Sequence, residues 1–116
     1  MLFLISSMSA VTYFNSNGVF DAKITYVNNV KAPYSVILDI ENTVGEKLDY
    51  DVELIYKRSN FVAGYDYFSC DYNCERRVIL KKVFFGDHEV VIRTKYGGKY
   101  YEKKINWTIT VAAVEY

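Results

Sequence analysis

Apolar and polar residues alternate with a period of two along most of this chain. Segment 34–42 shows the pattern, and it returns in 48–57 after a polar break. Such alternation is typical of strands with one face on a core and one face in water. No window keeps the i, i+3, i+4, i+7 spacing of an amphipathic helix. The clearest strand candidates lie at 22–27, 34–42, 48–57, 78–80, 88–96 and 105–111. We count seven or eight short strands in all, which predicts an all-β fold, an antiparallel β-sandwich.

One hairpin can be placed in register from its turn. The pair Gly97–Gly98 supplies the positive-φ positions of a two-residue turn. Counting outward from this turn places Arg93 opposite Glu102, which is a favourable charge pair. The same register places His88 opposite Trp107, so we expect the only histidine to pack on an aromatic ring at the edge of the core.

The two segments 34–42 and 48–57 carry acidic residues on their polar faces. If they formed a simple hairpin, Asp39 would lie opposite Asp51, and directly opposed like charges are unfavourable. We therefore expect the chain to cross from one sheet to the other at 43–47. The alternative is a cation such as Ca²⁺ on the acidic face, but no loop clusters Asp, Asn and Gly as calcium sites do.

Part of the chain resembles a known class of modules. The stretch Val36–Asn42 followed by Val52–Leu54, and the stretch Val83–Ile92 before a final strand at 105–111, are similar to immunoglobulin-like, cell-adhesion-related modules of bacterial and archaeal surface proteins. The resemblance covers roughly residues 34–111. It implies an immunoglobulin-like β-sandwich, and it says more about fold than about activity.

Length and charge narrow the class of protein. The chain has 116 residues, which fits one domain, and its 14 basic residues balance 14 acidic ones. A net charge of zero argues against a nucleic-acid-binding protein, since those usually carry a basic excess. We expect an apolar N-terminal segment, 1–14, followed by a single immunoglobulin-like domain, 15–116.

The N-terminal segment is too short to span a bilayer as a helix and too apolar to lie free in water. We expect it to be an assembly strand that pairs with this domain or with a neighbouring subunit. The alternatives are the remnant of a leader or of a membrane anchor, which would bring the N-terminus close to a membrane. Its apolar residues are Leu2, Phe3, Leu4, Ile5, Val11, Tyr13 and Phe14.

The two cysteines indicate the compartment. Cys70 and Cys74 are four residues apart, a spacing that fits neither a redox motif nor a zinc site. We expect a disulfide between them, as in an extracellular or cell-surface protein. Asn106 begins a glycosylation sequon, which is consistent with the same location.

The chain carries no recognisable catalytic motif. It has no nucleophile elbow, no phosphate-binding glycine loop and no zinc-protease motif. No nucleophile is placed near His88 by any motif, so we expect no enzyme activity, no metal site and no cofactor.

The segment 61–72 is unusually aromatic and is the candidate interaction surface. Tyrosine combines an apolar ring with a hydrogen-bonding tip, which suits protein interfaces and sugar stacking. Two interpretations stay open here: an edge strand whose aromatic rings cap the core, and an aromatic loop that presents them to a partner. Its members are Phe61, Tyr65, Tyr67, Phe68 and Tyr72.

These features favour a non-enzymatic structural or interaction module of a cell surface, such as a filament subunit or a filament-accessory protein. Its partners would be other protein subunits, including copies of itself, and not nucleic acid. The alternatives are a carbohydrate-binding module that uses the aromatic loop on a polysaccharide, and a viral structural protein.

Overall fold

The computed structural model describes residues 13–15, 18–28 and 34–110, and this part of the chain contains eight strands and no helix. The all-β class is therefore confirmed. In chain order the strands are β1 (Tyr13–Asn15), β2 (Phe20–Asn28), β3 (Ser35–Asn42), β4 (Leu48–Tyr56), β5 (Phe61–Cys70), β6 (Asn73–Ile79), β7 (Gly86–Tyr96) and β8 (Lys99–Ile109).

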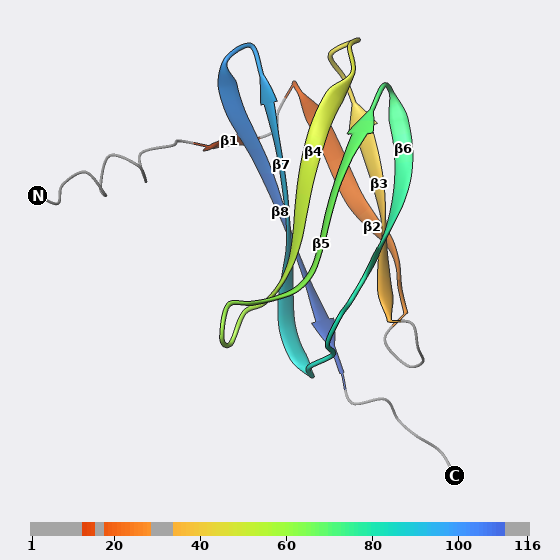
Figure 1. Cartoon of the computed structure of the whole chain (residues 1–116), viewed down its shortest axis with the longest axis vertical. Helices are drawn as coiled ribbons and strands as arrows, with labels where there is room; N and C mark the ends of the chain where they lie inside the picture. The colour runs from red at the N-terminus through yellow and green to blue at the C-terminus, as the bar shows by residue number, and fades with distance from the viewer. Residues whose placement is uncertain (1–12, 16–17, 29–33, 111–116) are drawn as a thin grey trace, which may run out of the picture.

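The strands form two sheets (Figure 1). The large sheet has the order β1-β8-β7-β4-β5, and the small sheet has the order β2-β3-β6. Neighbouring strands are antiparallel except for β1, which pairs with β8 in parallel. Buried side chains from both sheets form one hydrophobic core, as the period-two pattern requires.

The predicted hairpin register is confirmed. β7 and β8 pair from Gly86 opposite Ile109 to Tyr96 opposite Lys99. The turn residues Gly97 and Gly98 have φ values of 59° and 78°, which suits a two-residue turn that matches the twist of the strands. Arg93 lies opposite Glu102 with a 3.0 Å ion pair between Nε and Oε2.

The predicted crossing at 43–47 is also confirmed. β3 belongs to the small sheet and β4 to the large sheet, so the acidic faces of these two strands do not pair. The small sheet does place Glu41 of β3 opposite Asp21 of β2. Lys103 offsets this repulsion: its Nζ donates to Asp21 Oδ1 at 2.7 Å, and this hydrogen bond lowers the pKa of Asp21.

The N-terminal assembly segment lies almost entirely outside the described residues. Only the backbone of Tyr13 and Phe14 is described, and it pairs with Tyr100 and Tyr101 at the start of β8. The other residues expected to take part, Leu2 to Ile5 and Val11, fall outside the described ranges.

An aromatic cluster joins the two sheets near the end of the sandwich that carries the 43–47 crossing. Tyr50 of β4 is fully buried; its ring meets that of Phe20 of β2 edge-on at 5.2 Å and stacks on Phe68 of β5 at 5.7 Å. Burial raises the pKa of Tyr50 to about 12. Because the hydroxyl is buried and has no hydrogen-bond partner among the described residues, Tyr50 contributes mainly as an apolar ring.

A second aromatic cluster closes the end of the core. Tyr56 stacks on Phe84 at 4.6 Å and contacts His88 at 5.2 Å, and His88 in turn contacts Trp107 at 4.9 Å. His88 is fully buried, so the expected packing on an aromatic ring is confirmed, although the histidine lies deeper than the core edge. Trp107 is only half-buried.

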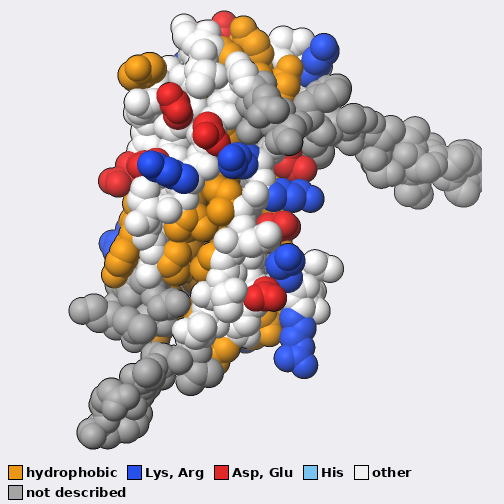
Figure 2. All heavy atoms as spheres, turned by 180° about the vertical axis from the view of Figure 1, so that it is seen from behind, with side chains coloured by type: hydrophobic (Ala, Val, Ile, Leu, Met, Phe, Trp, Pro, Cys, Tyr) orange, Lys and Arg blue, Asp and Glu red, His pale blue; other side chains and the backbone are white. Residues whose placement is uncertain are grey.

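Hydrophobic side chains are incompletely covered on one side of the molecule. Seen from behind, they gather near the middle of this face, with Lys, Arg, Asp and Glu side chains around them (Figure 2). Several residues that pack against the core are likewise only half-buried. They include Ile24, Val27, Tyr101, Ile105 and Trp107.

We expect His88 to make stability depend on pH. Burial lowers its pKa below the ordinary 6.5, although Nδ1–H donates to the Gly86 carbonyl at 2.9 Å. Since the unfolded chain then binds a proton more readily than the folded one, the free energy of unfolding decreases as the pH falls below 6.5. The slope has an upper limit of about 1.4 kcal/mol per pH unit.

Chemical denaturation between about pH 5.5 and pH 7 measures this slope, because the chain has no other histidine. The variant His88→Phe, which keeps a buried aromatic ring, should flatten it. An equal slope in the two proteins would contradict the assignment.

Candidate interaction surface

The aromatic segment is a strand and not a loop. Residues Phe61–Cys70 form β5, and no other strand of the described chain pairs with the far edge of β5. The edge-strand interpretation is therefore correct and the loop interpretation is wrong, although among these aromatic residues only Phe68 is buried against the core. A register irregularity opposite Leu54 and Ile55 leaves Ala63 without a partner on β4, which breaks the alternation that would have identified the strand.

The strand divides the predicted surface residues between two faces. Phe61, Tyr65 and Tyr67 are 40%, 51% and 60% exposed, whereas Phe68 is 6% exposed and packs on Tyr50. Phe68 was wrongly predicted to lie on the surface; as the neighbour of Tyr67 on a strand, it points the other way. Tyr72 lies beyond the strand, in the turn before β6, and is 70% exposed.

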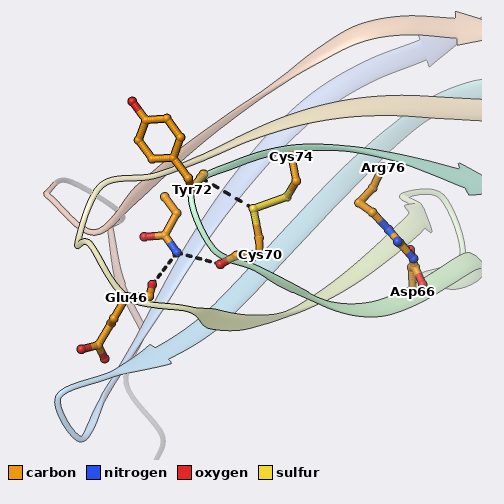
Figure 3. Close-up of a disulfide and its surroundings, with 7 residues drawn as sticks. Glu46, Asp66, Cys70, Tyr72, Cys74 and Arg76 are labelled. Atoms are coloured by element: carbon orange, nitrogen blue, oxygen red, sulfur yellow. Dashed lines mark hydrogen bonds and ion pairs between the residues drawn. A yellow bond between two sulfur atoms is a disulfide. The ribbon is translucent and has the colours of Figure 1, made fainter.

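The turn after β5 carries the chain from the large sheet to the small sheet. Cys70 and Cys74 form a disulfide across this corner, with their Cα atoms 6.1 Å apart (Figure 3). Cys70 is buried in the large sheet, and Cys74 is on β6 of the small sheet. The bond therefore fixes the two sheets to each other at this end.

Asn42, at the crossing between β3 and β4, stabilises the same corner. Its side-chain amide donates to the carbonyls of Glu46 at 2.8 Å and Cys70 at 2.9 Å, and its Oδ1 accepts from Val44 N at 3.1 Å. Its backbone N–H donates to Tyr72 O at 2.7 Å. The side chain is 1% exposed, so these bonds are shielded from water. Nothing in the sequence pattern assigns Asn42 a role except its place at the end of a strand.

The single charged residue of β5 is paired inside the molecule. Asp66 Oδ2 accepts from Arg76 Nε at 3.0 Å and Nη2 at 2.8 Å, joining β5 to β6 (Figure 3). The Arg76 guanidinium also lies 4.7 Å from the centre of the Phe68 ring. The edge of β5 therefore carries no charge that could repel another strand.

The first part of the β5 edge is covered and the second part is open. Lys81 N donates to Ala63 O at 2.6 Å. Gly64 faces Ile79 O so closely that a Cβ would come within 2.8 Å of it, which explains the glycine. The part of β5 that remains available to a partner is 65–69.

The outer face of the large sheet is charged beside this edge. Arg93 on β7 is bound to Glu53 Oε1 at 2.9 Å and to Glu102 Oε2 at 3.0 Å. Asp51 lies between Tyr67 and Arg93 in the register, and burial raises its pKa. The Asp51 charge in turn is the main cause that raises the pKa of Tyr65.

The predicted glycosylation residue lies on the surface of the large sheet. Asn106 is exposed on β8, with its Oδ1 3.4 Å from Lys57 Nζ. Within the described ranges, no three His, Cys, Asp or Glu side chains are grouped so that they could hold a metal ion. The same ranges contain no helix long and apolar enough to cross a membrane.

No protein-family model matches the chain, and a search of curated proteins returns no match either.

We predict that the Cys70–Cys74 disulfide is present in the native protein. Loop-closure entropy for so short a loop gives a stabilisation of about 2 kcal/mol, so the double variant Cys70→Ala/Cys74→Ala should lose about that free energy of unfolding. Alkylation followed by intact mass should label two thiols only after reduction, since the chain has two cysteines in all. Two thiols labelled in the unreduced native protein would contradict the prediction.

Proposed function

We propose that this chain is a non-enzymatic structural module of a cell surface that associates with copies of itself through the open edge of β5. One observation carries the proposal: residues 65–69 form a sheet edge with which no described strand pairs, and this edge presents tyrosines and has its only charge, Asp66, bound to Arg76. Soluble proteins usually protect such edges with lysine, proline or a covering segment. An edge without that protection is suited to strand addition.

The strand order supports an immunoglobulin-like assignment. In an immunoglobulin sandwich, strands A, B and E share one sheet and strands G, F and C share the other, extended in some domains by C′. The orders β2-β3-β6 and β8-β7-β4-β5 match A-B-E and G-F-C-C′. In this proposal β5 is the C′ edge strand.

A second copy is a suitable partner because an antiparallel edge is complementary to itself under a two-fold axis. An axis through Tyr67 places Tyr65 of each copy opposite Ser69 of the other. The same axis places Asp66 opposite Phe68, so the two Asp66 carboxylates do not face each other. The two large sheets would then join into one.

A two-fold interface alone gives dimers, and a filament needs a second, different contact. Tyr13 and Phe14 pair with β8 of their own chain, so we propose that the preceding part of the N-terminal segment 1–14 supplies that contact by strand addition to a neighbour. The disulfide and the sequon at Asn106 support an extracellular or cell-surface location for such an assembly.

We expect Tyr67→Lys to weaken self-association by at least about tenfold, because it places two ammonium groups opposite each other across the axis. Sedimentation equilibrium over a concentration series measures the dissociation constant. Tyr26→Lys is the matched control, since Tyr26 is 54% exposed on β2, an edge strand of the small sheet.

The proposal is wrong if the wild-type chain stays monomeric throughout the series. It is also wrong if the two variants weaken association equally, because the contact would then not involve β5. Thermal unfolding of both variants checks that a change in association is not a change in folding.

A further inference from the structure

A second candidate site lies on the outer face of the large sheet, mostly outside β5. An open cleft of about 580 Å³ lies on the outer face of this sheet, beside the turn between β7 and β8. Its lining comes from β4, β5, β7, β8 and the segment before β4. The lining residues include Asp49, Asp51, Tyr67, Arg93, Lys95 and Tyr100.

The charges that line the cleft balance. Three acidic and three basic side chains take part, namely Glu46, Asp49, Asp51, Lys47, Arg93 and Lys95. A site for a phosphate-rich ligand or a cation would carry an excess of one sign. The balance therefore favours a neutral ligand that donates and accepts many hydrogen bonds.

Tyrosines stand on opposite sides of the cleft. Tyr67 on β5 is 60% exposed and Tyr100 on β8 is 37% exposed. The strands β4 and β7 lie between them, so three strand spacings, about 14 Å, separate β5 from β8. This width accommodates a chain of sugar rings, and an exposed aromatic ring provides a flat apolar surface for the C–H face of a sugar.

The floor of the cleft offers an unused acceptor. Asp51 Oδ1 is buried and has no hydrogen-bond partner in the described chain. A buried acceptor without a partner is costly, and a ligand hydroxyl that enters after a small movement of the surrounding side chains would remove this cost. Nearby, Lys95 Nζ lies 5.4 Å from the centre of the Tyr100 ring, where it can also donate to a ligand oxygen.

We propose that this cleft is a binding site for a neutral polysaccharide, with sugar rings placed over β4 and β7 between Tyr67 and Tyr100. The site shares Tyr67 with the proposed β5 contact, but Asp51 is on β4 and Tyr100 is on β8, so variants at these two residues test the site separately. It also differs from a carbohydrate site confined to residues 61–72, since most of the lining comes from β4, β7 and β8.

The test uses the full chain and affinity electrophoresis in gels that contain dextran, mannan or neutral xylan, with alginate as an anionic comparison. We expect at least one neutral polymer to retard the wild-type chain. Tyr100→Ala and Asp51→Ala should each weaken that binding by about tenfold or more, as expected for a lost stacking ring or a lost acceptor. Tyr26→Ala, which removes an exposed tyrosine of the small sheet, should bind as the wild type does.

Tyr100→Leu keeps an apolar side chain of similar bulk at the same strand position, so it controls for a folding defect in Tyr100→Ala. It should bind as weakly as Tyr100→Ala. No retardation by any neutral polymer would overturn the proposal. Undiminished binding in the Tyr100 variants, or salt-sensitive binding to alginate alone, would also overturn it. Sedimentation of the same variants separates the two proposals, because self-association should not change when Tyr100 or Asp51 is replaced.

Discussion

The rest of the structure depends on how two of the crossings between sheets, the first at 43–47 and the second at 71–72, are fixed to each other. The buried amide of Asn42, at the end of β3, bonds to the first crossing through Glu46 O and to the second through Cys70 O. The bond to Cys70 O is buried and the bond to Glu46 O is half-buried, so the amide pairs both backbone carbonyls where water has limited access. The disulfide and the Asp66–Arg76 ion pair join β5 to β6, the strands before and after the second crossing. Together they set where β5 ends and how it lies beside β6.

That constraint explains why the edge of β5 is both exposed and uncharged. Asp66 is held by Arg76 on the small sheet, so it cannot act as the protective charge that edge strands usually present to solvent. The tyrosines that alternate with it must then face outward, because the inward positions are filled by Phe68 and Cys70. The interaction that joins the two sheets therefore also creates the surface on which self-association is proposed.

Much of the fold was predictable from local signals, but the candidate sites were not. The Gly97–Gly98 turn fixed the β7–β8 register, and repulsion between the acidic faces of β3 and β4 predicted the crossing. The irregularity at Ala63 interrupts the alternation along β5, so a loop and an edge strand both stayed open. Phe68 was therefore wrongly placed on the surface. The role of Asn42 could not be predicted, because a single buried amide produces no periodic pattern in the sequence. The cleft combines residues that meet only through the pairing of four strands, from Asp49 to Tyr100.

The two proposals reinforce each other geometrically. A two-fold axis at β5 would place the outer faces of two large sheets on one continuous surface, with one cleft on each side of the axis. A long polysaccharide could then contact both clefts, and linked sites bind more tightly than either site alone without any new contact. Under this arrangement a weak affinity at each cleft is sufficient for retention on a polymer. Dimerisation through an edge that would otherwise be a liability would thus double the binding surface.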